Sequence, residues 1–270
     1  MVQAAQSIAT QERPIFIELD GISKTFSTRD RASTLAVDDV SIEIGASEFI
    51  SLLGPSGCGK STLLSIVAGL IQPTKGEARI DGRPILAPYT NVGIVFQSDL
   101  LLDWRTVLGN VLFQFEMRGL KAEPHRDRAR ALIRSVGLGD FEQKYPWELS
   151  GGMRQRVAIC RALVHDPPLL LMDEPFGALD ALTRAQLQID LQTIWQSSRK
   201  TVVFVTHSID EAVFLSDRII VMTPRPGRVR EIIDIDLPRP RGLDAREHPA
   251  FTEAINRVNH LFQDMGVIRA

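Results

Sequence analysis

A glycine-rich loop at residues 54–62 has the residue types that bind phosphate. It reads GPSGCGKST, with the pattern G-x-x-x-x-G-K-S, between an apolar stretch at residues 48–53 and a helical pattern at residues 63–70. Glycines let backbone N–H groups approach phosphate oxygens, and a helix N-terminus adds unpaired donors and partial positive charge. Lys60 can reach the β- and γ-phosphates, and Ser61 can place its hydroxyl on Mg²⁺. The loop predicts a nucleotide site formed by Gly54, Pro55, Ser56, Gly57, Cys58, Gly59, Lys60, Ser61 and Thr62.

Two carboxylates, Asp173 and Glu174, follow a wholly apolar run at residues 169–172. Such a run is typical of a parallel strand buried on both faces, and open α/β sheets bind ligands at the carboxyl ends of their strands. We therefore predict that Asp173 holds Mg²⁺, usually through water, and that Glu174 polarises an attacking water. An acidic pair that caps the next helix is the alternative. Pro175 and the separation from a helix expected near residue 181 disfavour it.

Two further polar residues follow expected strands. His207 comes after residues 201–205, and Gln97 comes after residues 92–96. Taken alone, a histidine at a strand end is more often structural than catalytic. Because the loop and the acidic pair already place phosphate chemistry at this sheet edge, we predict catalytic roles for both residues. Gln97 is also expected to reach the metal or the water.

The remaining hydrophobic patterns describe the elements that must position these groups. Residues 15–19 and 40–44 alternate apolar and polar side chains, as in half-buried antiparallel strands. Residues 105–148 have a helical texture instead. An α/β alternation then returns, with further strands expected at residues 201–205, 219–222 and 229–235 and helices around residues 187–195 and 209–215. The chain therefore has an α/β pattern interrupted by a helical insertion.

Composition bounds the class of protein. The 270 residues carry 31 Lys+Arg and 33 Asp+Glu, a net charge of −2, with 44% hydrophobic residues. This excludes a disordered or collagen-like chain, and it removes the electrostatic argument for a nucleic-acid partner. Two cysteines in no CxxC pair favour a reducing, cytosolic compartment. We see no secretory signal, and the longest apolar stretch, residues 63–71, is far shorter than the ~20 residues of a membrane helix.

The sequence LSGGMRQR at residues 149–156 resembles the signature of ATP-binding cassette (ABC) ATPases. Its physical role is that of a second anion site, because a serine caps a helix whose first turn exposes glycine N–H groups. The chain already has one phosphate loop, so this second site suggests the γ-phosphate of an ATP held by another copy. The predicted contacts are Ser150, Gly151, Gly152 and Gln155.

The resemblance covers roughly residues 15–222, with the elements in family order. It implies a P-loop NTPase (ABC ATPase) core with an antiparallel β subdomain and an inserted α-helical subdomain. It also implies that Phe26 stacks on adenine, where the family more often has Tyr, and that Asp180 lies in the D-loop. Gln97 corresponds to the Q-loop, Asp173 and Glu174 to the Walker B pair, and His207 to the switch histidine. The expected boundaries are a tail at 1–14, the ATPase domain at 15–240 with its helical subdomain at about 100–160, and a C-terminal helical extension at 241–270.

Two short segments, residues 101–107 (LLDWRTV) and 224–228 (PRPGR), resemble the nitrate/sulfonate/taurine type of importer ATPase, although Asp103 stands where that type more often has Pro. In the family the first segment faces the permease, so Trp104 is expected at that interface; a core aromatic of the helical subdomain is the alternative. An apolar stripe on the last helix predicts core packing rather than membrane binding, with Phe251, Ala254, Ile255, Val258, Phe262 and Met265.

The resemblance implies a complete set of partners. ATP and Mg²⁺ are expected as ligands, a second copy of the chain completes an ATP-sandwich dimer, and integral membrane permease subunits receive the motion. A solute-binding protein is an indirect partner, and the chain would lie at the cytoplasmic face of the inner membrane as a peripheral subunit. The alternative is a soluble ABC ATPase of cofactor assembly or repair without a permease. A P-loop kinase outside the family is disfavoured by the signature.

Overall fold

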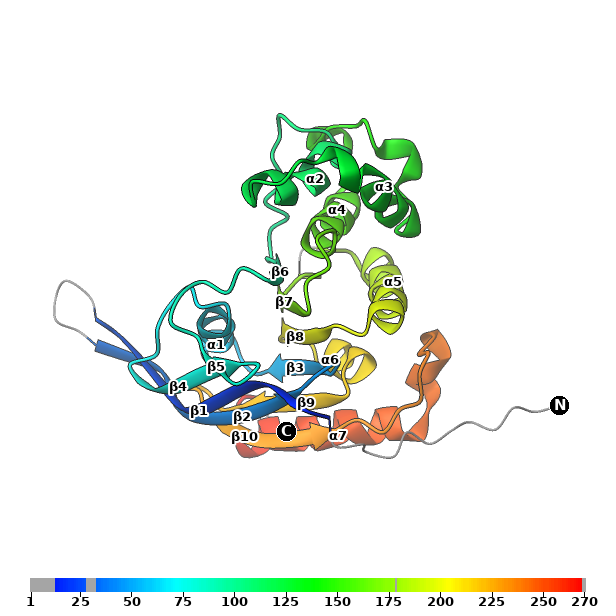
Figure 1. The fold of residues 1–270 in the computed structure, drawn as a ribbon. Helices are drawn as coiled ribbons and strands as arrows, with labels where there is room; N and C mark the ends of the chain where they lie inside the picture. The colour runs from blue at the N-terminus through cyan, green and yellow to red at the C-terminus, as the bar shows by residue number, and fades with distance from the viewer. Residues whose placement is uncertain (1–12, 28–32, 178, 269–270) are drawn as a thin grey trace.

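The computed structural model describes residues 13–27, 33–177 and 179–268, which form two sheets and a separate group of helices. The expected α/β fold with an antiparallel sheet and a helical insertion is confirmed (Figure 1). Most of the tail expected at residues 1–14 lies outside the described part of the chain. The first sheet is antiparallel, in the order β2 (Ser33–Gly45), β1 (Ile15–Ser27), β4 (Lys75–Ile80) and β5 (Arg83–Pro84).

The second sheet carries the strands that precede the predicted catalytic residues. Its order is β10 (Val229–Asp234), β9 (Arg218–Met222), β3 (Phe49–Leu53), β8 (Thr201–Thr206), β7 (Leu169–Asp173) and β6 (Val92–Val95). All neighbouring pairs are parallel except β10 with β9. Strands β3, β7 and β8 are almost wholly buried, which explains their continuous apolar sequences.

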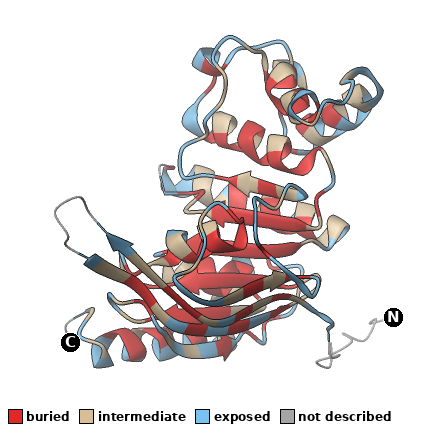
Figure 2. Cartoon of the chain, turned by 60° about the vertical axis from the view of Figure 1, so that its left-hand side comes forward, coloured by how far each residue is buried: buried red, intermediate tan, exposed pale blue. Residues whose placement is uncertain are grey.

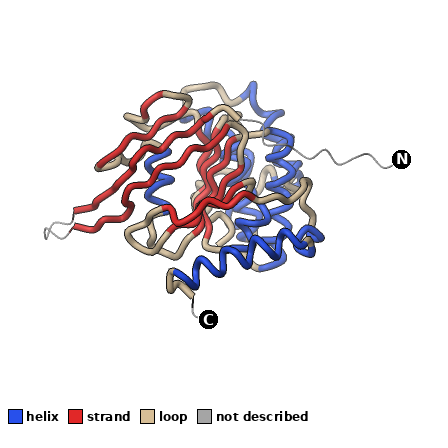
Figure 3. The backbone as a smooth tube through the Cα atoms, turned by 90° about the horizontal axis from the view of Figure 1, so that it is seen from below, coloured by secondary structure: helices blue, strands red, loops and turns tan. Residues whose placement is uncertain are grey.

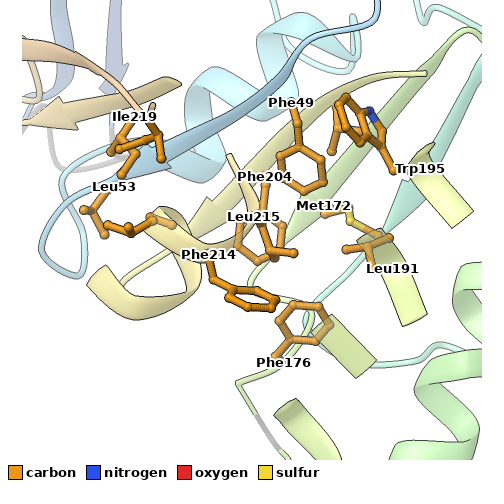
Figure 4. Close-up of a cluster of buried hydrophobic side chains, with 14 of the residues drawn as sticks. Phe49, Leu53, Met172, Phe176, Leu191, Trp195, Phe204, Phe214, Leu215 and Ile219 are labelled. Atoms are coloured by element: carbon orange, nitrogen blue, oxygen red, sulfur yellow. The ribbon is translucent and has the colours of Figure 1, made fainter. Parts of the chain in front are cut away.

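Helix α1 (Lys60–Val67) packs between the two sheets. Its apolar face meets strands of both sheets in one buried cluster, and Figure 3 shows it between them. The opposite face of the second sheet packs on α5 (Ala181–Ser198) and α6 (Ile209–Leu215). Figure 4 shows the aromatic centre of that cluster, where the Phe49 ring lies edge-on to Trp195 with ring centroids 5.8 Å apart. Both faces of the parallel sheet are therefore covered, as a parallel sheet requires.

The helical group has a core of its own. It comprises α2 (Val107–Met117), α3 (Arg126–Ser135) and α4 (Gly151–Leu163), with short 3₁₀ turns between them. In Figures 1 and 2 it stands beyond β6, and most of its buried apolar residues form a cluster separate from those of the sheets. Of its helices, α4 also contributes buried residues to the cluster on the sheet, so it joins the two parts.

The C-terminal segment packs against the sheet side of the molecule. Helix α7 (Pro249–Asp264) buries the predicted apolar stripe at Phe251, Ala254, Val258 and Phe262, so the core-packing interpretation is confirmed. Before it, Arg241 is 2% exposed and donates to the carbonyl oxygens of Val213, Phe214 and Ser216 at the end of α6. None of the described helices is long and apolar enough to cross a membrane.

Two elements differ from the expectations. The helix after the phosphate loop begins at Lys60 rather than residue 63, and it ends at Val67 because Gly69 takes a left-handed conformation with φ of 71°. Strand β4 was not predicted, since its sequence KGEARI has only two buried apolar residues, Ala78 and Ile80. It forms because β1 extends to Ser27 and pairs with it over residues 17–23.

Candidate nucleotide-binding and catalytic site

The predicted site residues follow the carboxyl ends of neighbouring strands in the second sheet. Strand β3 runs into the phosphate loop, and its neighbour β8 runs into His207. Strand β7 lies next to β8 and ends in Asp173 and Glu174, while β6 at the edge leads to Gln97. Because all four strands are parallel, their ends meet at one edge, and the sheet order brings together residues that are far apart in the sequence.

The phosphate loop is held in shape by Lys60. Its side chain is 4% exposed, and Nζ donates to the carbonyl oxygens of Gly54 at 2.8 Å and Pro55 at 3.1 Å. Gly59 has φ of 103°, and a Cβ there would lie 2.6 Å from Val37 Cγ2. Gly59 is also the N-cap of α1 and supplies no side-chain cap, so the first-turn amides stay available to a ligand.

A cavity of about 320 Å³ lies in front of this loop. Most of the lining comes from residues predicted from sequence: Phe26, Ser56, Gly57, Gly59, Lys60, Ser61, Thr62 and Glu174. Gly54, Pro55 and Cys58 support the loop from behind, and burial raises the pKa of the Cys58 thiol. Three lining residues were not predicted: Thr34 and Ala36 of β2, and Arg225 after β9. Only Arg225 lay in a segment that the sequence had singled out.

One pair of side chains has the chemistry of a magnesium site. Ser61 Oγ donates to Asp173 Oδ1 at 3.0 Å. Burial, with the neighbouring Glu174 carboxylate, raises the pKa of Asp173, so a cation placed there would relieve the cost of its charge. The described residues contain no cluster of three His, Cys, Asp or Glu that could hold an ion alone. The Ser61 hydroxyl and the Asp173 carboxylate fit Mg²⁺, which binds through one or two protein oxygens together with phosphate oxygens and water.

Glu174 and His207 form a second pair at the same edge. His207 Nδ1 lies 3.1 Å from Glu174 Oε2. Glu174 has φ of 44°, a left-handed conformation that is uncommon for a residue with a long side chain, and its N–H donates to Val205 O. Gln97 also reaches this loop, since its Nε2 would lie 3.5 Å from a Cβ on Gly177. The carboxylate and the imidazole therefore pair beside the cavity, and the Gln97 amide lies near Gly177 in the loop that follows Glu174.

The capping alternative for the acidic pair is wrong. Asp180 is the N-cap of α5, and its Oδ1 accepts hydrogen bonds from the N–H groups of Leu182 and Thr183, both at 3.1 Å. A side-chain hydrogen bond from Thr183, together with these backbone bonds, lowers the pKa of Asp180. Asp173 and Glu174 cap none of the described helices, and their carboxylates contact Ser61 and His207 instead.

A partly buried network connects the neighbours of His207 to the start of α5. Thr206 Oγ1 donates to Glu211 Oε2 at 2.6 Å and accepts a hydrogen bond from Ser208 N at 3.0 Å. Arg184 lies 3.6 Å from the other Glu211 oxygen and donates to Leu179 O at 2.8 Å. The residues on both sides of His207 are therefore tied to the loop that contains Asp180.

The signature residues lie outside the cavity. Ser150 caps α4 by accepting a hydrogen bond from Met153 N, and Gly151 is exposed at the first position of that helix. Gly152 packs on α5, where a Cβ would lie 2.3 Å from Thr183 Cγ2. Gln155 is buried and donates to Phe96 O at 3.4 Å. Asp180 does not line the cavity either, so one chain does not bring these residues to its own phosphate loop.

Comparisons with known proteins identify the family. A family model described as ABC transporter matches residues 37–177. The chain belongs to the ABC transporter family. It is 47% identical over 248 residues to an uncharacterized ABC transporter ATP-binding protein of Methanocaldococcus jannaschii, covering 92% of this chain and 91% of that protein. The resemblance drawn from the signature is therefore confirmed.

Other ABC relatives carry more specific names. A taurine import ATP-binding protein of Rhizobium johnstonii is 48% identical over 223 residues, which is 83% of this chain and 85% of that protein. An aliphatic sulfonates import ATP-binding protein of Bacillus cereus is 42% identical over 253 residues, 94% of this chain and 98% of that protein.

A solved structure confirms the ABC fold. A dimeric ATP-binding cassette in a post-hydrolysis state bound to ADP and Pi superposes with a TM-score of 0.72 at 34% identity, covering 81% of this chain and 98% of that one. The present chain is thus an ABC ATPase subunit with an ATP-binding cassette fold.

Proposed function

We propose that this chain is the ATP-hydrolysing subunit of an importer that moves a small organic solute through a separate membrane permease. One observation carries the hydrolytic part: four neighbouring strands end at one sheet edge, where the phosphate loop and Glu174 line the cavity, Asp173 contacts Ser61 and His207 contacts Glu174. The importer part rests on relatives named for taurine and aliphatic sulfonate import, which match over 83% and 94% of this chain. The proposed solute is taurine, another sulfonate, nitrate or a similar small molecule.

Each residue at the edge has a task in the proposed hydrolysis. The adenine stacks on Phe26, and the loop N–H groups and Lys60 hold the phosphates. Ser61, Asp173 and Gln97 would hold Mg²⁺, which neutralises charge on the phosphate oxygens. Glu174 accepts a hydrogen bond from the attacking water and takes its proton. His207 lies 3.1 Å from Glu174 and orients that carboxylate.

The site is completed by a second copy of the chain. Ser150 and Gly151 lie at an exposed helix N-terminus, away from the cavity of their own chain. In a head-to-tail pair, that helix N-terminus would face the γ-phosphate in the partner's cavity, with Asp180 beside it. ATP then joins the two copies, and loss of the γ-phosphate releases them.

The permease is proposed to dock on the helical group near Trp104. Trp104 is 73% exposed, so the core-aromatic alternative is wrong. Its loop is firmly held, because the buried Asn110 side chain donates to the carbonyl oxygens of Leu102, Arg105 and Thr106 and accepts from Leu102 N. A large apolar side chain held outward on an ordered loop is typical of an interface anchor.

This arrangement makes the chain a peripheral subunit at the cytoplasmic face of the inner membrane. A solute-binding protein on the other side would select the solute and signal its presence through the permease. The chain itself is proposed to contact neither the solute nor nucleic acid, because its anion sites are local helix ends and Lys60. The specificity of import is therefore expected to lie in the other subunits.

The experiment is affinity purification of the chain from detergent-solubilised membranes, followed by reconstitution of the recovered complex in lipid vesicles. We expect an integral membrane permease to copurify and ATP hydrolysis to rise several-fold when a solute-loaded binding protein is added. Candidate solutes are taurine, aliphatic sulfonates and nitrate. Recovery of soluble scaffold proteins alone, with no solute-stimulated hydrolysis, would instead support a soluble ABC ATPase of cofactor assembly or repair.

A matched pair of variants tests the docking surface. Trp104→Ala removes the exposed indole, and we expect it to lower permease recovery while hydrolysis by the isolated chain stays within about twofold. Leu86→Ala is the control, because Leu86 is 80% exposed outside the helical group. Equal permease recovery with both variants would remove Trp104 from the interface.

A further inference from the structure

The loop between β9 and β10 packs directly against the phosphate loop. Gly227 donates its N–H to Ala36 O at 2.9 Å, and its own carbonyl accepts from Asp38 N at 2.9 Å. A Cβ on Gly227 would lie 1.9 Å from Cys58 O, so only glycine allows this approach. The loop is therefore part of the wall behind the nucleotide cavity, although no step of the proposed hydrolysis uses its residues.

Internal hydrogen bonds hold this loop in one conformation. Thr223 N donates to Arg228 O, Arg228 N donates to Thr223 Oγ1, and Thr223 Oγ1 donates to Pro226 O. Outside the loop, the Arg228 guanidinium pairs with the Asp38 carboxylate on β2. Residues between these anchors, Arg225 among them, are thus held at a defined position beside the cavity.

Arg225 is the charged residue that this loop presents to the cavity. Its Nε donates to Gly57 O at 3.1 Å, and its Nη2 would lie 3.3 Å from a Cβ on Gly57. It lines the same cavity as Phe26, Thr34 and Lys60. Within the described residues Arg225 has no carboxylate partner, in contrast to Arg228.

We propose that Arg225 is a nucleotide-binding residue that contacts the anionic phosphate chain of ATP or ADP from outside the phosphate loop. A guanidinium has five N–H donors, and Gly57 O occupies the one on Nε, so the four on the two Nη atoms remain for phosphate oxygens. The contact to Gly57 fixes the plane of the group before the ligand arrives, which lowers the entropy cost of binding. The inference rests on the proposed ATP site and extends it by one residue.

Three variants separate anion binding from support of the loop. Arg225→Gln keeps an N–H donor for Gly57 O but removes the charge, whereas Arg225→Lys keeps the charge. Arg230→Ala removes a positive charge from an exposed residue that does not line the cavity. Calorimetry would measure the Kd for ADP and for a non-hydrolysable ATP analogue at low and high salt. The KM for MgATP and kcat would be measured in parallel.

We expect Arg225→Gln to raise Kd and KM about tenfold, the effect of losing one charge-assisted hydrogen bond, with kcat nearly unchanged. Its affinity should also depend less on salt, because one cation at the phosphates is gone. Arg225→Lys should retain much of the affinity, and Arg230→Ala should match wild type.

Two results would overturn the inference while leaving the ATP site intact. Either Arg225→Gln binds within twofold of wild type, or Arg225→Lys is as weak as Arg225→Gln, which would mean that Arg225 only supports Gly57. Lys60→Ala is measured as a further variant, and it should lose nucleotide binding whichever of these two results is found. Absence of nucleotide binding by wild-type protein would refute the proposed function itself.

Discussion

Helices α1 and α4 both begin beside glycines, and their N-termini differ in what surrounds them. Helix α1 starts after Gly59, has no side-chain cap and opens into the cavity. Helix α4 starts after Ser150, whose hydroxyl accepts from Met153 N, and it opens onto the surface at Gly151. The first is enclosed by strands of both sheets, whereas the second belongs to the helical group (Figure 1), where Gly152 packs against α5.

This difference supports different functions for the two regions: nucleotide binding and hydrolysis at α1, and contact with a second copy at α4. The α1 region contains the groups proposed for binding and hydrolysis: Lys60, Ser61, Asp173, Glu174 and His207. The α4 region adds a helix end that we propose binds the γ-phosphate held by a second copy. Changes at the first region should therefore affect one chain by itself, and changes at the second should matter only when two chains meet.

Glu174→Gln is expected to have the largest effect. The amide cannot take a proton from water, so ATPase activity should fall at least 100-fold, whereas ATP still binds and dimers accumulate. Phosphate release measures turnover, and calorimetry with size-exclusion chromatography measures binding and association. Turnover close to that of wild type would refute Glu174 as the base and would weaken the contrast between the two regions.

Gly151→Asp tests the second region. A Cβ there would lie 3.9 Å from Arg154 Nη2, so the residue fits without a clash. The added carboxylate would face a partner's γ-phosphate, and this repulsion should lower ATPase about tenfold to 100-fold. The Kd for nucleotide in one chain should not change.

Gly151→Ala is the matched control, since it adds a side chain without charge and should keep most of the activity. Size-exclusion chromatography with ATP would compare dimer formation by both variants. A loss of nucleotide affinity in Gly151→Asp would show that the signature acts within its own chain, contrary to the division proposed here.

The smallest effect concerns the junction between the regions. His165 follows α4, and its Nε2 lies 3.2 Å from Val92 O on β6. Burial, followed by the nearby Arg118 charge, lowers the pKa of His165 from 6.5 to about 4. The unfolded chain therefore binds the proton more readily, so the stability that neutral His165 contributes is present above pH 6.5 and is lost as pH falls toward 4.

After allowance for the partial exposure of His165, the loss at pH 5 is about 1 kcal/mol. Urea unfolding without nucleotide at pH 7 and pH 5 would measure it. His165→Gln should show a smaller drop in midpoint between the two pH values than wild type, whereas the exposed His260→Gln should behave like wild type. An equal drop in His165→Gln would exclude this residue as the source.

Much of the site was predictable because its parts are local. The phosphate loop is recognisable from nine consecutive residues, and Asp173, His207 and Gln97 each follow an apolar strand. The rule that parallel strands place ligands at their carboxyl ends then predicted that these groups converge, as the Ser61–Asp173 and Glu174–His207 contacts show. Thr34 and Ala36 had no such signal, because they line the cavity only through the position of β2.

Several properties depended on packing between distant segments. Gln155 belongs to the signature, yet its side chain is buried against Phe96, which lies 59 residues away. Trp104 has the residue type of a core position but is exposed, because Asn110 fixes its loop on the surface. Whether such a side chain is buried or exposed depends on which surfaces pack together, and residue type predicts burial only weakly.

By itself, the sequence determined the residues on which the proposed chemistry rests: a glycine-rich loop typical of phosphate binding, acids and a histidine at strand ends, and the signature. Local spacing is enough for these features, because backbone geometry places neighbours in sequence at predictable positions. The tertiary structure decided which of these groups share a cavity, that Arg225 joins them from a distant loop, and that the signature opens away from it. Those relations arise from sheet order and core packing, where contacts join residues far apart in the chain.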